Sequence, residues 1–490
     1  MSYKKYSSKT VVYGSRKYLN KKKYNLLNIF VLILFLPLTL YLFNRQTGIF
    51  SRAYLDLTGR KANLIIDLIG SNNAELIRPN LAQGGEEKGG MLKSVITQVN
   101  NIKPGYIRID HIYDFYNVVD QDVEGNLVYK WEKLDEEIGD ILAVGAKPFL
   151  SLSYMPGAIS TGSEVEIPKN WEDWQEVVKN TVEHVSGIDN LGISDVYYEV
   201  WNEPDLFGDY KVGTGKDYRQ LYKYAALGAS AAKKTYPFKF GGPATTGLYK
   251  NWFDGLLIYT KENNFRIDFY SWHRYSKHLK DFENDFKAAS VWLEDYPEYS
   301  DLEFVISESG FNSENDSGYD NEYSAIHTLG LYTLVSILNI KQDVKIFTFE
   351  IKDGPGDTQY WGRWGLLTHE NFGQPVTKPR YKAIEYLNSM QGISTPVYGQ
   401  GSWVSAFSVK NTNGYKLLVI NYDSYGKHYE NVPIQFVGLP SRKFIFRRVN
   451  FLGDTIEFPV ETPSDNWKTE ILMKPNSAMI IEIVPIGQFD

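Results

Sequence analysis

The sequence predicts an α/β protein built around a closed (β/α)8 barrel, followed by a β-sandwich and preceded by one transmembrane helix. Three observations lead to this prediction. Short apolar, β-prone runs alternate with longer amphipathic stretches over residues 61–392. After residue 392 the pattern changes to closely spaced strands separated by Gly, Pro and Asn-Gly turn signals. Near the start, the stretch 24–43 contains no charged side chain.

The amino-terminal end combines a basic head with this apolar stretch. The whole chain carries −7, and residues 1–25 hold eight Lys or Arg without an acid, so the rest carries −15. The positive flank of a membrane helix normally stays cytoplasmic. We therefore expect a cytoplasmic head at 1–25, an anchor at 26–43, a linker at 44–60, and a single-pass cell-membrane protein whose folded part is extracellular. The alternative is a cleaved signal peptide, but residues 41–45 offer no small-x-small cleavage pattern.

The composition excludes several classes of function. The chain has no cysteine, which rules out disulfide bonds, thiolate catalysis and cysteine-ligated metals. The acidic main part lacks the basic footprint that a nucleic-acid partner requires. With 490 residues, 43% of them apolar, the chain is long enough for one large domain and a smaller one.

The barrel is expected at 61–392 because eight β-prone runs can be counted there. They are 63–67, 106–110, 147–153, 196–201, 238–242, 267–272, 303–308 and 345–350. Apolar residues recur at helical spacing between them, at 131–144, 171–185, 216–236, 322–340 and, last, 379–390. Eight such units predict a (β/α)8 TIM barrel. The sandwich is expected at 393–490, with strands at 404–409, 416–422, 443–449 and 478–484.

Two glutamates stand where chemistry is expected in such a barrel. Active sites lie at the carboxyl ends of the strands; Glu203 follows the fourth run and Glu308 ends the seventh. Paired carboxylates are what glycoside hydrolysis requires, one to protonate the leaving oxygen and one to attack the anomeric carbon. The pair needs no cofactor, and the seven histidines show no tight metal-ligand spacing. We therefore expect neither a cofactor nor a metal.

Several segments carry a resemblance to a known family. Residues 201–204, Trp-Asn-Glu-Pro, resemble the Asn-Glu acid/base motif of clan A glycoside hydrolases, with Glu308 as the partner on the seventh strand. Further segments resemble glycoside hydrolase family 39, which includes β-xylosidases, α-iduronidases and some bacterial exopolysaccharide endoglycosidases. These segments are 106–111, 241–244, 271–275 and 364–367. The resemblance covers about 60–392 well and the terminal sandwich more loosely.

The resemblance implies roles for three residues. Glu203 would be the acid/base, Glu308 the nucleophile, and Asn202 would hold the 2-hydroxyl of the sugar. Retention of the anomeric configuration would follow, because a nucleophile about 5–5.5 Å from the acid/base leaves no room for an inverting water.

Three neighbouring residues are predicted to support this pair. Arg108, near the end of the second run, is expected to hydrogen-bond Glu308 and keep it ionised. The alternative is a structural Arg paired with Asp110 or another buried acid. His273 and Tyr275, after the sixth run, are expected to contact the two carboxylates. An ordinary loop histidine and a packing tyrosine are the alternatives.

Further residues are expected to bind more of the sugar. Trp361 and Trp364 are expected to form a stacking platform alongside Tyr154 and Trp171, with ordinary packing as the alternative. Glu350 closes the eighth run, where clan A enzymes commonly place an aromatic residue near the sugar.

The function predicted from these features is a retaining hydrolase of β-linked glycans, with an extracellular polysaccharide or oligosaccharide as its substrate and partner. An anchored enzyme would meet a polysaccharide that emerges at its own cell surface. Two alternatives stay open. One is an exo-acting β-xylosidase-like enzyme, and the other is a catalytically silent glycan-binding or scaffold protein of a polysaccharide export system.

Overall fold

The protein is seen in a computed structural model that describes residues 59–72, 74–84, 90–359 and 361–486. The chain divides into two units, 1–60 and 61–490, and the fold is that of the second unit. The predicted head, anchor and linker lie outside the described residues, except for residues 59 and 60. No helix within the described ranges is long and apolar enough to span a bilayer.

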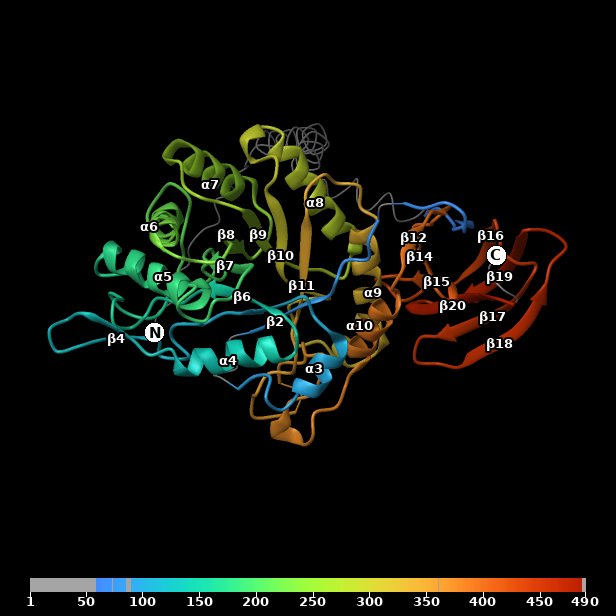
Figure 1. The fold of residues 1–490 in the computed structure, drawn as a ribbon, viewed down its shortest axis with the longest axis horizontal. Helices are drawn as coiled ribbons and strands as arrows, with labels where there is room; N and C mark the ends of the chain where they lie inside the picture. The colour runs from blue at the N-terminus through green and yellow to red at the C-terminus, as the bar shows by residue number, and fades with distance from the viewer. Residues whose placement is uncertain (1–58, 73, 85–89, 360, 487–490) are drawn as a thin grey trace, which may run out of the picture. The chain divides into compact units, whose positions relative to one another are not determined.

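Eight parallel strands close into a barrel, each hydrogen-bonded to two neighbours (Figure 1). Around the barrel they follow the order of the sequence, as connections between adjacent βα units require. The strands are β2 (Asn80–Gln83), β3 (Tyr106–Ile109), β6 (Lys147–Leu152), β7 (Val196–Val200), β8 (Phe238–Thr245), β9 (Phe269–Tyr275), β10 (Glu303–Gly310) and β11 (Val344–Phe349). The closed (β/α)8 barrel is therefore confirmed.

One predicted barrel strand is wrong. Residues 63–67 do contain a strand, β1 (Leu64–Asp67), but it pairs parallel with β16 (Glu430–Val437) and antiparallel with β13 (Val397–Tyr398) of the sandwich. The first barrel strand is β2 instead. An apolar run shows that a strand is buried but not which sheet it joins, and β2 has only two apolar residues, Leu81 and Ala82.

The barrel interior is filled in layers. At the amino end, Glu303 accepts a hydrogen bond from Tyr197 and pairs with two lysines. Above it lies a packed apolar layer that includes Phe149, Phe269 and Phe347. In parallel strands the side chains two residues further along point to the same side. The next polar layer, towards the carboxyl end, is therefore built from residues such as Glu199, two positions beyond Tyr197.

Helices cover the outside of the barrel through amphipathic faces. In Figure 1, helices α4 to α8 surround strands β6 to β10. Asn170, Asp217 and Asn321 cap three of the helices, each accepting a hydrogen bond from the backbone two residues ahead. The helices are α3 (Ile96–Ile102), α4 (Glu132–Ala143), α5 (Trp171–Ser186), α6 (Tyr218–Ala231), α7 (Lys250–Asn263), α8 (Leu279–Leu293), α9 (Glu322–Ser336) and α10 (Pro379–Ser389). Short 3-10 turns lie at η2 (Pro297–Tyr299), η3 (Ser317–Asp320) and η4 (Glu370–Phe372).

The carboxyl-terminal part is a β-sandwich, as predicted, made of two sheets around their own apolar core. The larger sheet has the strand order β12-β14-β15-β20-β17-β18 and the smaller one β13-β1-β16-β19. Their remaining bounds are β12 (Ile393–Thr395), β14 (Val404–Asn411), β15 (Gly414–Asn421), β17 (Lys443–Asn450), β18 (Thr455–Glu461), β19 (Asn466–Met473) and β20 (Ser477–Pro485). A separate hairpin pairs β4 (Val119–Gln121) with β5 (Leu127–Tyr129).

Helix α9 joins the barrel to the sandwich. Most of its side chains are buried on all sides, so its sequence shows no polar face. On the barrel side, Tyr332 hydrogen-bonds Thr348 of β11. On the sandwich side, Tyr323 donates to the backbone of Ser424, and Tyr422 donates to the carbonyl of Lys277. Sandwich residues such as Leu418 and Ile480 belong to the same core cluster as the barrel helices.

Candidate active site

Six of the eight predicted site residues lie together at the carboxyl end of the barrel. They come from four strands or the residues directly after them: β3, β7, β9 and β10. Hydrogen bonds, together with an ion-pair contact of 3.5 Å between His273 and Glu308, link all six. The members of this network are Arg108, Asn202, Glu203, His273, Tyr275 and Glu308.

Local backbone geometry brings the carboxylates to face each other. Strand β10 runs beside β9 in a register that sets Glu308 next to His273, with Gly310 beside Tyr275. A side chain at position 310 would lie 2.8 Å from the Tyr275 ring, so the tyrosine can approach only because this residue is glycine. Beyond β7 the chain turns sharply, with Glu203 at φ 44°, and the Glu203 amide bonds the carbonyl of Ala244 at 3.0 Å.

Arg108 organises the base of the site. Its guanidinium donates to Glu199 Oε2, Glu308 Oε1 and Asn202 Oδ1, each at 2.8 Å, and it is fully buried. Burial alone would lower the pKa of Arg108, but the charges of Glu199 and Glu308 outweigh it and raise that pKa. Both interpretations of Arg108 therefore hold: it binds Glu308, and it also pairs with a structural buried acid, which is Glu199 rather than Asp110.

Arg108 also fixes the orientation of Asn202. A guanidinium only donates hydrogen bonds, so the Asn202 atom facing it is the amide oxygen. The amide nitrogen, Nδ2, then points away and donates to the hydroxyl of Tyr154 at 2.9 Å. A sugar hydroxyl placed beside Asn202 would meet an amide donor.

His273 lies between the two glutamates. Its Nδ1 is 2.8 Å from Glu203 Oε1 and 3.5 Å from Glu308 Oε2, and the ring is fully buried. Burial alone would lower the pKa of His273, but the charge of Glu308 and the hydrogen bond to Glu203 raise it above the ordinary value of 6.5. The histidine thus favours a proton on the nitrogen that faces both carboxylates.

Of the two carboxylates that face each other, Glu308 is buried and Glu203 is partly exposed. Tyr275 donates to its Oε2 at 2.8 Å while Arg108 holds Oε1, so both oxygens have a donor. Burial raises the pKa of Glu308 above its usual 4.5, and the nearby His273 and Arg108 only partly offset this effect. Burial, together with the charge of Glu308, likewise raises the pKa of Tyr275 far above its usual range, so it stays a neutral donor.

The two carboxylates and the imidazole lie close together. One oxygen of Glu203, one of Glu308 and a ring nitrogen of His273 all lie within 4.8 Å of one another. Two carboxylates and an imidazole at this spacing could also hold a metal ion. The expectation of a metal-free site therefore stays a prediction.

Three residues lie at the site in ways that the sequence analysis did not predict. Glu199 holds Arg108, and Tyr154 hydrogen-bonds Asn202 at 2.9 Å. Asp110 is buried one residue beyond β3. Glu199 and Asp110 do carry a signal in the sequence, because they follow the inward-facing Tyr197 and Arg108 by two positions. Tyr154 has the parity of Leu150 and Leu152, which pack in the core cluster of the helices, so strand alternation does not predict it. Which inward residues reach substrate, and which only pair with each other, depends on contacts between strands.

The two predicted tryptophans do not join the network. Trp361 is 41% exposed and packs over Gly354 and Gly356 in the loop after β11. Trp364 packs on Phe349, with ring centroids 6.3 Å apart, and Phe349 in turn lies 6.1 Å from Tyr275. Their binding of sugar stays a prediction.

The chain has an aromatic residue directly before Glu350, at the end of the last barrel strand. Phe349, the last residue of β11, packs against Tyr275 of the site. Glu350 is fully buried, and its Oε2 accepts a hydrogen bond from Gln83 at 3.2 Å.

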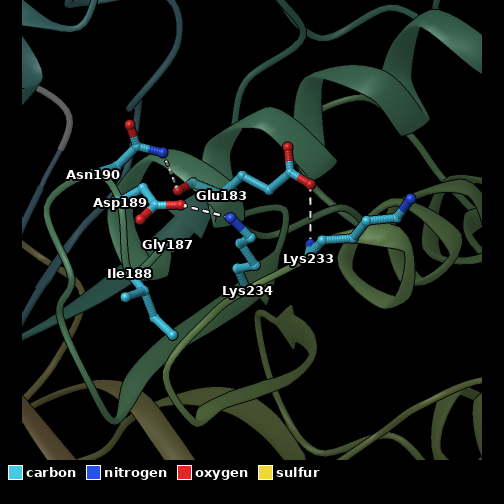
Figure 2. Close-up of a pocket in the computed structure, with 7 residues that line it drawn as sticks. All are labelled: Glu183, Gly187, Ile188, Asp189, Asn190, Lys233 and Lys234. Carbon is cyan, nitrogen blue, oxygen red and sulfur yellow. Dashed lines mark hydrogen bonds and ion pairs between the residues drawn. The ribbon is translucent and has the colours of Figure 1, made fainter.

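Two surface hollows lie apart from this network. One of about 220 Å³ is lined by loops that enter β7 and β8, at the amino end of the barrel, where Lys234 pairs with Asp189 at 3.1 Å (Figure 2). Active sites of such barrels lie at the opposite, carboxyl end of the strands. The other, about 310 Å³, lies between the loops after β6 and β7, on the same face as Glu203, and Trp171 lines it.

Comparisons with known proteins show which proteins the chain resembles. The family described as "Glycosyl hydrolases family 39" matches residues 86–290. A β-xylosidase of Caldicellulosiruptor saccharolyticus is 25% identical over 378 residues, which is 70% of this chain and 72% of that protein. A β-xylosidase of Geobacillus stearothermophilus is 31% identical over 183 residues, 34% of this chain and 35% of that protein.

Solved structures share the fold. A monomeric β-xylosidase from Caulobacter crescentus CB15 superposes with a TM-score of 0.72 at 19% identity, over 87% of this chain and 100% of that one. A family 39 enzyme from Xanthomonas axonopodis pv. citri gives 0.70 at 18% identity, over 87% and 98%. The profile match, these relatives and the paired glutamates at the strand ends lead to one assignment. Residues 86–290 match glycoside hydrolase family 39, and the likeness to this family that the sequence predicted is shown.

Proposed function

We propose that the protein hydrolyses β-glycosides with retention of configuration, using Glu203 as acid/base and Glu308 as nucleophile. The observation that carries this proposal is the distance between them, since an oxygen of each lies within 4.8 Å of the other. Retaining enzymes hold their carboxyl groups about 5–5.5 Å apart, whereas inverting enzymes need about 6.5–9.5 Å to admit a water. The spacing favours direct attack by Glu308.

The reaction proceeds in two displacements. In the first, an oxygen of Glu308 bonds to the anomeric carbon while the glycosidic bond breaks and the leaving oxygen takes the proton of Glu203. In the second, Glu203 accepts a proton from water, the water oxygen bonds to the anomeric carbon, and Glu308 is released. Asn202 donates from Nδ2 to the neighbouring hydroxyl of the sugar, because Arg108 has fixed its amide orientation.

The first step needs one proton on the carboxylate pair, carried by Glu203. Arg108 and Tyr275 both donate to Glu308, which favours the negative charge there. His273 donates to Oε1 of Glu203, leaving Oε2 to carry the proton towards the leaving group. When the Glu308 ester forms, its negative charge disappears and Glu203 loses its proton more easily, which suits its second role as a base.

The substrate that we propose first is a β-xyloside. Both curated relatives reported above are named β-xylosidases, and this favours the exo-acting alternative over the polysaccharide-cleaving one. Cleavage within an extracellular polysaccharide remains the second candidate, and the hollow beside Trp171 on the face of Glu203 supports it, because it offers space for further sugar units. Product analysis separates the two: single sugars support exo action, and mixed oligosaccharides support cleavage within the chain.

We also propose that residues 26–43 anchor the enzyme in the cell membrane with the barrel outside. The support is the uncharged stretch after the basic head. Protease added to intact cells should digest the barrel, and deletion of residues 1–43 should release it from the membrane fraction. Protection of the barrel in intact cells would contradict this orientation.

The mechanism is tested by trapping the covalent intermediate. A 2-deoxy-2-fluoro xyloside with a good leaving group should inactivate the enzyme and add one sugar mass to the peptide that contains Glu308. NMR of the first product formed from an aryl β-xyloside should show the β-anomer. An α-anomer as first product, or a label on another residue, would overturn the proposed roles.

A further inference from the structure

Asp110 is a buried acid beside the nucleophile that the proposed mechanism does not use. It lies one residue beyond β3, and its residue is 7% exposed. It follows Arg108 by two positions, so it projects to the same, inward side of the barrel. Its charge acts on Arg108, on Glu308 and on Tyr154. Asp110 therefore lies at the carboxyl end of the barrel, two positions beyond the arginine that binds the nucleophile.

This carboxylate lacks a protein partner. No other residue of the described ranges donates a hydrogen bond to Asp110 or forms an ion pair with it. Arg108 is close, but Nε, Nη1 and Nη2 are directed to Glu199, Glu308 and Asn202. Buried carboxylates are normally paired or hydrogen-bonded, because their desolvation is costly. Burial accordingly raises the pKa of Asp110, against the opposing charges of His111 and Arg108.

We infer that Asp110 is a sugar-binding residue whose two oxygens accept hydrogen bonds from hydroxyl groups of the reacting sugar. The inference rests on the proposed function and adds a substrate class to it. A carboxylate-bearing sugar would bring a negative charge next to Asp110 and Glu308, where the arginine of the network already pairs with two carboxylates. The site should therefore accept neutral sugars, such as pentoses and hexoses, and reject uronic acids.

The test compares the full-length wild type with Asp110→Asn on an aryl β-xyloside, its monodeoxy analogues and an aryl β-glucuronide. Loss of a hydrogen bond between a charged and a neutral group should lower kcat/KM on the xyloside roughly 10- to 100-fold. For the deoxy analogue that lacks the bound hydroxyl, the two proteins should differ by only about twofold. The ratio of glucuronide to xyloside activity should rise about tenfold or more in Asp110→Asn. Equal losses on the xyloside and on every deoxy analogue would overturn the inference.

Asp285→Asn is the matched control. Asp285 is 8% exposed, which is similar to the 7% of Asp110. It lies on α8, however, and is paired with Arg274. Its substitution should lower the thermal midpoint and leave kcat/KM per folded molecule unchanged.

Binding separates this inference from the proposed mechanism. Calorimetry with free xylose should show weaker binding to Asp110→Asn than to wild type, even if neither protein turns over a glycoside. Equal affinities would refute the role of Asp110, and so would a wild type that binds no neutral monosaccharide. An inactive wild type whose sugar binding depends on Asp110 would refute the hydrolytic mechanism alone.

Discussion

Replacing Arg108 tests the base of the active site most directly. Its guanidinium makes three hydrogen bonds of 2.8 Å, two of them to buried carboxylates, and no exposed atom could compensate for their loss. Arg108→Met keeps much of the volume but removes every donor. Breaking a buried ion pair by removing one partner costs about 3–5 kcal/mol, because a charge is left buried without compensation. We therefore expect the free energy of unfolding of Arg108→Met to fall by about 4 kcal/mol.

A second substitution isolates the cause. Glu199 is fully buried, and Arg108 is its one ion-pair partner within the described ranges. Adding Glu199→Gln to Arg108→Met removes the stranded charge and should restore about 1–3 kcal/mol. Urea unfolding followed by tryptophan fluorescence measures both effects, with Arg447→Met as control. Arg447 is 41% exposed and pairs with Glu457 and Glu482 at the sandwich surface, so its loss should cost less than about 1 kcal/mol.

Activity gives an independent measure of the same substitution. Arg108 lowers the pKa of Glu308, acting against burial. Without Arg108 that pKa rises further, so the acid limb of the kcat/KM profile should move to higher pH, about one pH unit per 1.4 kcal/mol of lost interaction. A loss of stability below about 1 kcal/mol, or a double variant no more stable than Arg108→Met, would refute this account of the network.

Three further predictions concern Glu308, Glu203 and His273. Glu308→Gln should lower kcat by about 10⁴-fold or more, whereas Glu303→Gln, on the same strand and equally 7% exposed but at the opposite end, should lose stability and keep its kcat; equal losses would contradict the assignment. In Glu203→Gln, kcat should fall strongly for poor leaving groups and little for dinitrophenyl glycosides in the first step, measured by burst kinetics; a loss independent of the leaving group would argue against an acid. Because burial raises the pKa of Glu308 and His273 opposes this, His273→Gln should move the acid limb to higher pH; a shift to lower pH would contradict the geometry.

Sequence patterns predicted the parts of the site that depend on one strand at a time. Glu203 and Glu308 stand at the ends of apolar runs, and the rule that barrel chemistry gathers at the carboxyl ends located both of them. Arg108, His273 and Tyr275 were found in the same way. The structure adds what no single strand contains: that Arg108 divides its charge between Glu199 and Glu308, and that no other described residue pairs with Asp110.

The errors have physical reasons. Strand β1 is apolar enough for a barrel, but pairing with β16 instead is decided by contacts more than 300 residues away in the sequence. A helical pattern also misjudged the ends of α6 and α9, since the last turns of both predicted helices are not helical.

Helix α9 makes the barrel depend on the sandwich. It follows the strand that carries Glu308, and its far side is covered by β14, β15 and β20 of the sandwich. Removing the sandwich would expose an apolar helix directly behind the nucleophile strand. The carboxyl-terminal domain is therefore not an interchangeable module, and shortened versions of the protein should keep every strand up to β20 and never end near residue 392.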